Sequence, residues 1–215
     1  MNGLMRWLPF AIALLAFVAS AVVYDAMPPT MATHWDAFGN ANGFMDKGTA
    51  LFFLPVLMLV LAGLFLLIPR IDPLKANIKK FEGAYWAFVT VMMLFMLALH
   101  LVSFAINAGY AIDIRYVLLP GLAAVFYCSG WLMERAQPNW FVGIRTPWTM
   151  SSPKVWKKTH ELGASLFKAT AILCMVFIFW IDLAVFVVIG MALATTVALV
   201  VYSFLEFQKE KRLKG

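Results

Sequence analysis

The sequence predicts an all-α, polytopic membrane protein with six transmembrane helices and both termini in the cytoplasm. Composition is the first support: 63% of the 215 residues are hydrophobic and only 13% are charged, whereas soluble domains carry about 25% charged residues. Secondly, apolar runs long enough to cross about 30 Å of hydrocarbon as helices recur along the whole chain. Thirdly, lysine and arginine fall almost entirely into alternate connections between these runs, which is typical of cytoplasmic loops.

Six runs of apolar residues predict the spanning helices. Five of them contain no Asp, Glu, Lys or Arg, and one is interrupted only by Lys168, near its start, where a lysine side chain reaches the interface. The third run is longer than one crossing requires, so we expect its end from about Asn107 to form a loop. The runs are 7–23, 51–68, 83–112, 116–133, 163–181 and 183–205.

Basic residues predict the orientation. With both termini placed inside, fifteen of the seventeen lysines and arginines lie on the inner side, and only Lys47 and Arg115 lie outside. An alternative is that Arg6, the apolar stretch after it and the small residues at 19–21 form a cleaved signal peptide, which leaves five helices. We favour six, because the run continues apolar to Val23 and an even number suits the basic C-terminal tail.

Two long connections divide the predicted bundle into two parts. Residues 1–69 form a two-helix hairpin whose outer loop spans 26–47, and residues 70–215 form a four-helix region whose inner loop spans 134–162. The basic segment 70–83 predicts a turn at the membrane interface whose end begins the third helix. No basic stripe with interleaved aromatics is present, so we expect membrane lipids as partners and no nucleic acid.

The outer loop combines turn formers with aromatic and ionisable side chains. Pro28 and Pro29 end the first helix in an extended exit, and His34, Trp35 and Asp36 follow. Imidazole and carboxylate both bind zinc, but a structural zinc needs about four protein ligands and this loop has one histidine, so we expect no metal ion. We expect a folded cap whose polar side chains satisfy its backbone, with a ligand-contacting loop as the alternative.

The inner loop contains the segment PNWFVGIRTPWTM at 138–150. Gly143 permits a tight turn there. Ser151 or Ser152 is expected to cap a helix with Pro153 in its first turn. Apolar residues then recur on one side and lysines on the other, which predicts a short amphipathic helix at the cytoplasmic interface leading into the fifth span.

Two inner-loop side chains carry the most versatile chemistry. Arg145 presents five donors and stays charged, so it suits lipid phosphate, a carboxylate or loop carbonyls. Histidine is the residue type whose ordinary pKa lies nearest neutral pH, which makes His160 a candidate acid or base. Thr159, His160 and Glu161 are consecutive, however, and such neighbours on a helix do not face one another. We therefore expect no catalytic residue and no cofactor. A membrane enzyme that uses His160 and Arg145 on a lipid or peptide is kept as an alternative.

His100 lies inside the third apolar run. An ionisable residue within a membrane marks a functional site by default, and a transporter or lipid-handling protein with His100 and Arg145 along its path is an open alternative. Because no second ionisable group is evident within the spans, we favour a single hydrogen bond from His100 to a hydroxyl or carbonyl of another helix.

The two loops resemble those of the SdpI family of bacterial and archaeal membrane proteins. The inner segment is similar to that family's N-x-x-x-G-I-R-T-P-W-T followed by W-x-x-T-H-x-x-G, and the outer loop to P-x-x-x-x-H-W-x-x-x-G-x-x-(D/N)-G-x-x-x-K. The inner matches are Asn139, Gly143, Ile144, Arg145, Thr146, Pro147, Trp148, Thr149, Trp156, Thr159, His160 and Gly163. The outer matches are Pro29, His34, Trp35, Gly39, Gly43 and Lys47, with Asn42 where aspartate is commoner.

The resemblance implies a multi-pass protein of the cell membrane that gives immunity against a secreted peptide toxin, in some members with signalling to a cytoplasmic regulator. The residues expected to contact a ligand or partner are His34, Trp35, Gly39, Gly43, Lys47, Asn139, Gly143, Arg145, Thr146, Trp148, Trp156, Thr159 and His160. These functions are binding rather than catalysis. A homodimer is left open, because so small a bundle buries few side chains at its centre.

Overall fold

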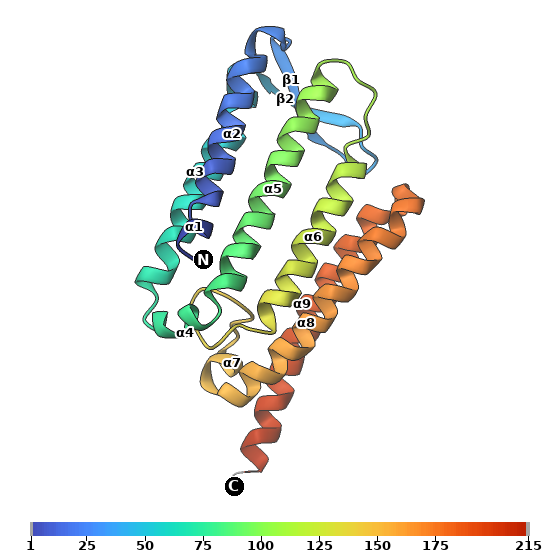
Figure 1. The fold of residues 1–215 in the computed structure, drawn as a ribbon. Helices are drawn as coiled ribbons and strands as arrows, with labels where there is room; N and C mark the ends of the chain where they lie inside the picture. Colours follow the sequence, from blue (N-terminus) through green and yellow to red (C-terminus); the bar gives the residue numbers. More distant parts are fainter. Residues whose placement is uncertain (1, 214–215) are drawn as a thin grey trace.

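The computed structural model describes residues 2–213 as a helical bundle with one β-hairpin (Figure 1). The elements are α1 (Asn2–Met5), α2 (Leu8–Val23), η1 (Tyr24–Ala26), β1 (Thr30–Trp35), β2 (Ala41–Asp46), α3 (Lys47–Ile71), α4 (Lys75–Lys80), α5 (Glu82–Asn107), α6 (Arg115–Met133), α7 (Pro147–Ser151), α8 (Pro153–Val176), η2 (Phe177–Trp180) and α9 (Ile181–Arg212). Helix is therefore the dominant structure, as predicted.

Within the described residues, five helical stretches are long and apolar enough to cross a membrane. Four of them contain α2, α3, α5 and α6, and the fifth covers the 60 residues Pro153–Arg212. That last stretch is not one straight rod, because the 3₁₀ turn η2 separates α8 from α9 and the two helices run back along each other (Figure 1). The molecule is a multi-pass membrane protein, and α5 ends at Asn107 as the sequence predicted.

The β-hairpin lies at one end of the bundle, and α4, α7 and the end of α9 lie toward the other (Figure 1). Its strands pair antiparallel, with Thr30 opposite Asp46 and irregular register around His34. The all-α prediction missed this hairpin, because its strands are short and their residues alternate poorly. Asp46 then begins α3, since its carboxylate accepts the amide N–H of Thr49 at 3.0 Å.

Side chains with almost no exposure form three clusters among the described residues, and the smallest joins Met31 of β1 to Leu51 of α3 and Phe104 of α5. The largest one joins α2, α3 and α5, with small residues of α2 such as Ala13 and Ala16 against Met58 of α3 and Val89 of α5. The second one joins α6 to α8 and α9. Most of the remaining apolar surface faces outward, as expected where lipid rather than water surrounds the helices.

Two predictions for the inner side were wrong in detail. The segment 75–80 forms its own helix, α4, and a break at Phe81 separates it from α5. No separate amphipathic helix lies at the interface: α8 begins at Pro153 and continues without interruption to Val176. Ser152 caps it by accepting the N–H of Val155. The segment contains no proline after Pro153, so α8 continues without a break into the apolar run.

Helices α6 and α8 approach each other closely at Gly130. A Cβ placed there would lie 2.7 Å from the carbonyl oxygen of Ala164 and 2.9 Å from Cγ of Lys168. Backbone cannot move aside as a flexible side chain does, so this glycine sets the distance between the two helices.

We therefore expect Gly130→Val to separate α6 from α8 and to lower the apparent Tm of the purified protein, since overpacking costs about 1–3 kcal/mol. The matched control is Gly190→Val on α9, where an added Cβ meets no atom within 4 Å. Thermal unfolding in detergent measures both. Equal Tm values for the two variants would show that the α6–α8 contact does not depend on Gly130.

Candidate functional site

Asn139 organises the first part of the inner loop (residues 134–162). Its side chain is fully buried. Its amide oxygen accepts the N–H groups of Phe141 and Val142 at 2.9 and 2.6 Å. Its amide nitrogen donates to the carbonyls of Gln137 and Val142 at 2.8 and 2.9 Å. These four bonds satisfy a backbone that no helix or sheet pairs, so Asn139 is placed for structure rather than for an external ligand.

His160 supports the next turn of the inner loop, at Gly143 and Ile144. Its Nε2 accepts the N–H of Ile144 at 3.0 Å, which makes Nδ1 the donor to the carbonyl of Trp156 at 2.8 Å. The imidazole also stacks on the Trp156 indole, with ring centroids 4.0 Å apart. Gly143 has a φ of +110°, and a Cβ there would overlap His160 Nε2. The motif's Gly143 and His160 therefore fit each other, and both ring nitrogens are used internally.

Thr146 and Thr149 form a reciprocal capping box at the start of α7. The Thr146 hydroxyl also donates to Ser203 of α9 at 3.0 Å, and Trp148 packs edge-on against Phe204 with ring centroids 5.1 Å apart. These contacts attach the inner loop to the last helix. Of the two capping residues that the sequence offered, Ser151 and Ser152, the structure uses Ser152 to cap α8.

Two inner-loop candidates differ from the others. The exposed Arg145 donates to the carbonyl of Trp140, which is one of the alternatives that the sequence left open. Thr159 is fully buried, and among residues 2–213 its hydroxyl is the one buried side-chain polar atom without a hydrogen-bond partner. Trp140 is 53% exposed, so it and Arg145 form the accessible part of this loop.

Sequence reasoning missed the two residues that tie the inner loop to the first half of the chain. Asp72 is 1% exposed and accepts the N–H of Trp140 at 2.9 Å and that of Leu74 at 2.6 Å. Asn77 of α4 donates to the carbonyl of Pro138 at 2.8 Å. The Asp-Pro dipeptide at 72–73 signalled a turn, but nothing in the sequence pointed to a loop 68 residues away.

The motif glycines of the outer hairpin lie where an added Cβ would come too close to a neighbouring residue. Gly39 has a φ of +84°, and a Cβ there would lie 2.8 Å from Oδ1 of Asp113. At Gly43 a Cβ would lie 2.8 Å from the Cβ of His34 on the facing strand. Lys47 places its ammonium 4.7 Å from the ring centre of Tyr24. These three candidates shape the hairpin and its attachment to the bundle.

His34 and Trp35, the other two outer candidates, line a cavity of about 370 Å³. We call this cavity the outer groove. The His34 imidazole bonds to Oδ1 of Asn42 across the hairpin at 2.5 Å. The lining residues are Thr33, His34, Trp35, Asp36, Met45, Ala50, Phe53, Leu54, Leu99, His100, Ser103, Ile114, Arg115 and Leu118. Most of these are apolar, and the volume is that of a small-ligand site.

His100 lies in the groove and is 2% exposed. Its Nε2 is 2.8 Å from the Ser20 hydroxyl, which itself donates to the carbonyl of Leu51 at 2.6 Å. The expected hydrogen bond from His100 to another helix is therefore confirmed. Arg145, on the inner loop, is not among the residues that line this cavity.

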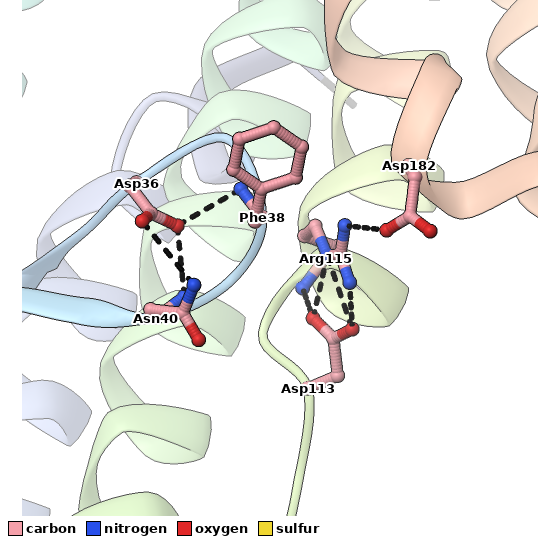
Figure 2. Close-up of polar contacts among 6 residues, drawn as sticks. All are labelled: Asp36, Phe38, Asn40, Asp113, Arg115 and Asp182. Carbon is pink, nitrogen blue, oxygen red and sulfur yellow. Dashed lines mark hydrogen bonds and ion pairs between the residues drawn. The ribbon is translucent and has the colours of Figure 1, made fainter.

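Charged side chains gather at the outer end of the groove (Figure 2). Arg115 bonds to Asp113 through Nε and Nη2 and to Asp182 through Nη1 at 2.8 Å. Burial opposes ionisation of Asp113, but the hydrogen bonds from Arg115 outweigh it and lower its pKa. Hydrogen bonds from Asn40 likewise lower the pKa of Asp36. Sequence reasoning did not select this cluster, because its members lie far apart in the chain.

No group of three or more His, Cys, Asp or Glu within residues 2–213 is placed to hold a metal ion. No solved structure matches the chain.

Comparison with known sequences gives three matches. Residues 135–203 match the sequence profile of the SdpI/YfhL protein family, and residues 11–59 match that of a domain of unknown function, DUF1648. Immunity protein SdpI of Bacillus subtilis (strain 168) is 23% identical over 204 residues, which cover 95% of each of the two chains.

We expect Gly143→Ala to loosen the inner loop and to increase the rate at which trypsin cuts the purified protein after Arg145, because the new methyl group displaces His160. Gly109→Ala is the matched control: Gly109 also has a positive φ, of +95°, but no atom lies within 4 Å of its added Cβ. Both variants share the cost of the left-handed backbone. Equal cleavage rates at Arg145 would mean that His160 does not hold the loop.

Proposed function

Since the chain is a member of the SdpI/YfhL protein family and carries an amino-terminal DUF1648 segment, we propose that it is an immunity-type membrane protein that protects a cell from a secreted antimicrobial peptide. One observation carries the proposal: the relation to immunity protein SdpI extends over 95% of both chains. It therefore includes the outer hairpin as well as the helices, so the surface that would meet a peptide is part of the shared sequence.

We assign recognition of the peptide to the outer end. The outer groove, next to the hairpin, combines a cavity with polar side chains, whereas the inner-loop motif is largely engaged in its own hydrogen bonds. His34 and Trp35 are the candidates that line the cavity. Of the thirteen loop residues that the sequence singled out, these two are the ones we propose as direct ligand contacts.

We assign a second contact, with a cytoplasmic regulator, to the accessible part of the inner loop. Trp140 and Arg145 are exposed on a backbone held by Asn139 and Asp72. Exposed aromatic and arginine side chains on a rigid support are typical of protein interfaces. This contact would let the inner loop signal while the outer end binds.

The proposal requires an orientation in which the hairpin is outside. We place six spans, counting α8 and α9 as two, with both termini in the cytoplasm. The turn η2 supports the division of the 60-residue stretch, and fifteen of the seventeen lysines and arginines then lie inside.

Labelling single cysteines tests this topology. In a chain without Cys128 and Cys174, a membrane-impermeant maleimide is expected to label Ala41→Cys on intact cells and to label Lys154→Cys only after the cells are opened. Both positions are exposed, so access depends on the side of the membrane. Labelling of Lys154→Cys on intact cells would reverse the orientation.

A growth assay tests the protection itself. Expression of the protein in cells that are sensitive to a secreted antimicrobial peptide is expected to raise their survival when that peptide is added. His34→Ala is expected to lower the peptide dose that these cells tolerate by about tenfold, because one good contact with the peptide is lost. Arg145→Ala is the comparison: it should keep protection and lose any response of the cytoplasmic regulator. Unchanged survival on expression of the wild type would remove the immunity function for that peptide.

A further inference from the structure

We propose that the outer groove binds an apolar segment of a cationic amphipathic peptide, with a hydrogen-bond donor of that segment bound to His100. This assignment rests on the proposed function and makes it more specific, because it names where the peptide enters and which chemistry the peptide must carry.

Residues of α3, α5, α6 and the hairpin line the groove. Leu99 and Ser103 come from α5, and Phe53 and Leu54 come from α3. Leu118 comes from α6, which Ile114 precedes, and Thr33, Trp35 and Met45 come from the hairpin. Both α3 and α6 pack on α5, and the hairpin extends across toward the start of α6 (Figure 1). An apolar segment that lies in the outer half of the membrane therefore finds apolar walls there.

His100 supplies the polar end of the groove. Because the Ser20 hydroxyl gives its proton to Leu51, it must accept from Nε2 of His100, and Nδ1 of the neutral ring is then an acceptor. Among the described residues, Nδ1 has no hydrogen-bond partner, although the side chain is 98% buried and lines the groove. Nδ1 is not one of the fully enclosed polar atoms, so it is reached from the groove, where a donor from a ligand can bond to it.

Ser103 adds a second polar group one turn from His100. Hydroxyls of other helices, such as those of Thr90 and Ser129, bond back to the carbonyl four residues earlier. The Ser103 hydroxyl makes no such bond to any described residue, and it lines the same groove. The groove thus presents one acceptor and one hydroxyl in an otherwise apolar wall.

The negative charge around Arg115, which lines the groove, favours a positively charged ligand. Asp36, Asp113 and Asp182 surround the single Arg115, which leaves an excess of negative charge (Figure 2). The Asp182 side chain is 74% exposed, so its charge is open to solvent. Such a field attracts a cation and raises the rate of its encounter with the groove.

These observations favour a peptide over a bilayer lipid. An acyl chain has no hydrogen-bond donor, so it would leave His100 Nδ1 unpaired. A lipid would also bring a phosphate toward carboxylates that repel it. A peptide with a serine, threonine or tryptophan in its apolar segment and lysine or arginine at its outer end satisfies both requirements.

Photo-crosslinking tests the assignment on the full chain in phosphatidylcholine vesicles. The probe is a leucine- and alanine-rich peptide with a central serine, a benzoylphenylalanine beside it and lysines at its outer end. A second peptide carries glutamates in place of the lysines. Mass spectrometry is expected to place the crosslinks of the lysine peptide on groove residues of α3, α5 and α6, with about tenfold less product from the glutamate peptide.

Four variants identify the groove and its charge. Leu99→Trp fills the groove and should abolish the crosslinks, whereas Leu101→Trp, on the same helix at a position 43% exposed and outside the groove, should keep them. Asp36→Asn should weaken binding of the lysine peptide, whereas Asp25→Asn, which removes the same charge away from the groove, should not. Thermal unfolding of each variant identifies any that fail to fold.

Three results would overturn the assignment. They are crosslinks on α8 or α9 instead of the groove, equal labelling by the two peptides, or labelling of the groove only by a phosphatidylcholine with a photoreactive acyl chain. The last result would make it a lipid site. Binding of the lysine peptide without cell protection would contradict only the proposed function. Protection that survives Leu99→Trp would contradict only the groove.

Discussion

Backbone groups that no helix or sheet pairs need other partners in a membrane protein, and this constraint shapes both ends of the bundle. Asp and Asn side chains supply many of these partners. Asn139 pairs with the backbone of the inner loop at both its oxygen and its nitrogen. Asn107, the last residue of α5, accepts the N–H of Ala32 at 2.7 Å and donates to its carbonyl at 3.0 Å. The hairpin and the inner loop are therefore each attached to the helices by side chains rather than by sheet.

The two ends differ in what remains unpaired once this requirement is met. At the end of the bundle that carries the inner loop, His160 uses both ring nitrogens and Asp72 uses both carboxylate oxygens. At the outer end, His100 uses one ring nitrogen and lines a cavity. The inner motif is consequently suited to holding a shape, and the outer end to receiving a ligand. This contrast is the reason for placing peptide recognition at the hairpin and not at the longer motif.

Particular residues show where prediction from the sequence succeeded. The apolar runs marked every long helix, because the length needed to cross hydrocarbon is a local property of the chain. The Ser152 cap and the end of α5 at Asn107 followed from local chemistry in the same way. The hairpin was missed, since its strands depend on pairing between 30–35 and 41–46 rather than on alternation within either one. The roles of Asn139 and His160 were missed because an isolated polar residue does not reveal its partner.

The sequence by itself determined the kind of molecule: a multi-pass membrane protein whose basic residues are concentrated in alternate connections between its apolar runs. Hydropathy and charge are sums over neighbours, so no fold is needed to read them. Only the tertiary structure decided which motif residues hold the loop backbone in place and which face a cavity. Gly39 approaches Asp113 across 74 positions, and His100 meets Ser20 across 80. Such contacts arise when the helices pack, since packing alone brings together residues so distant in the chain.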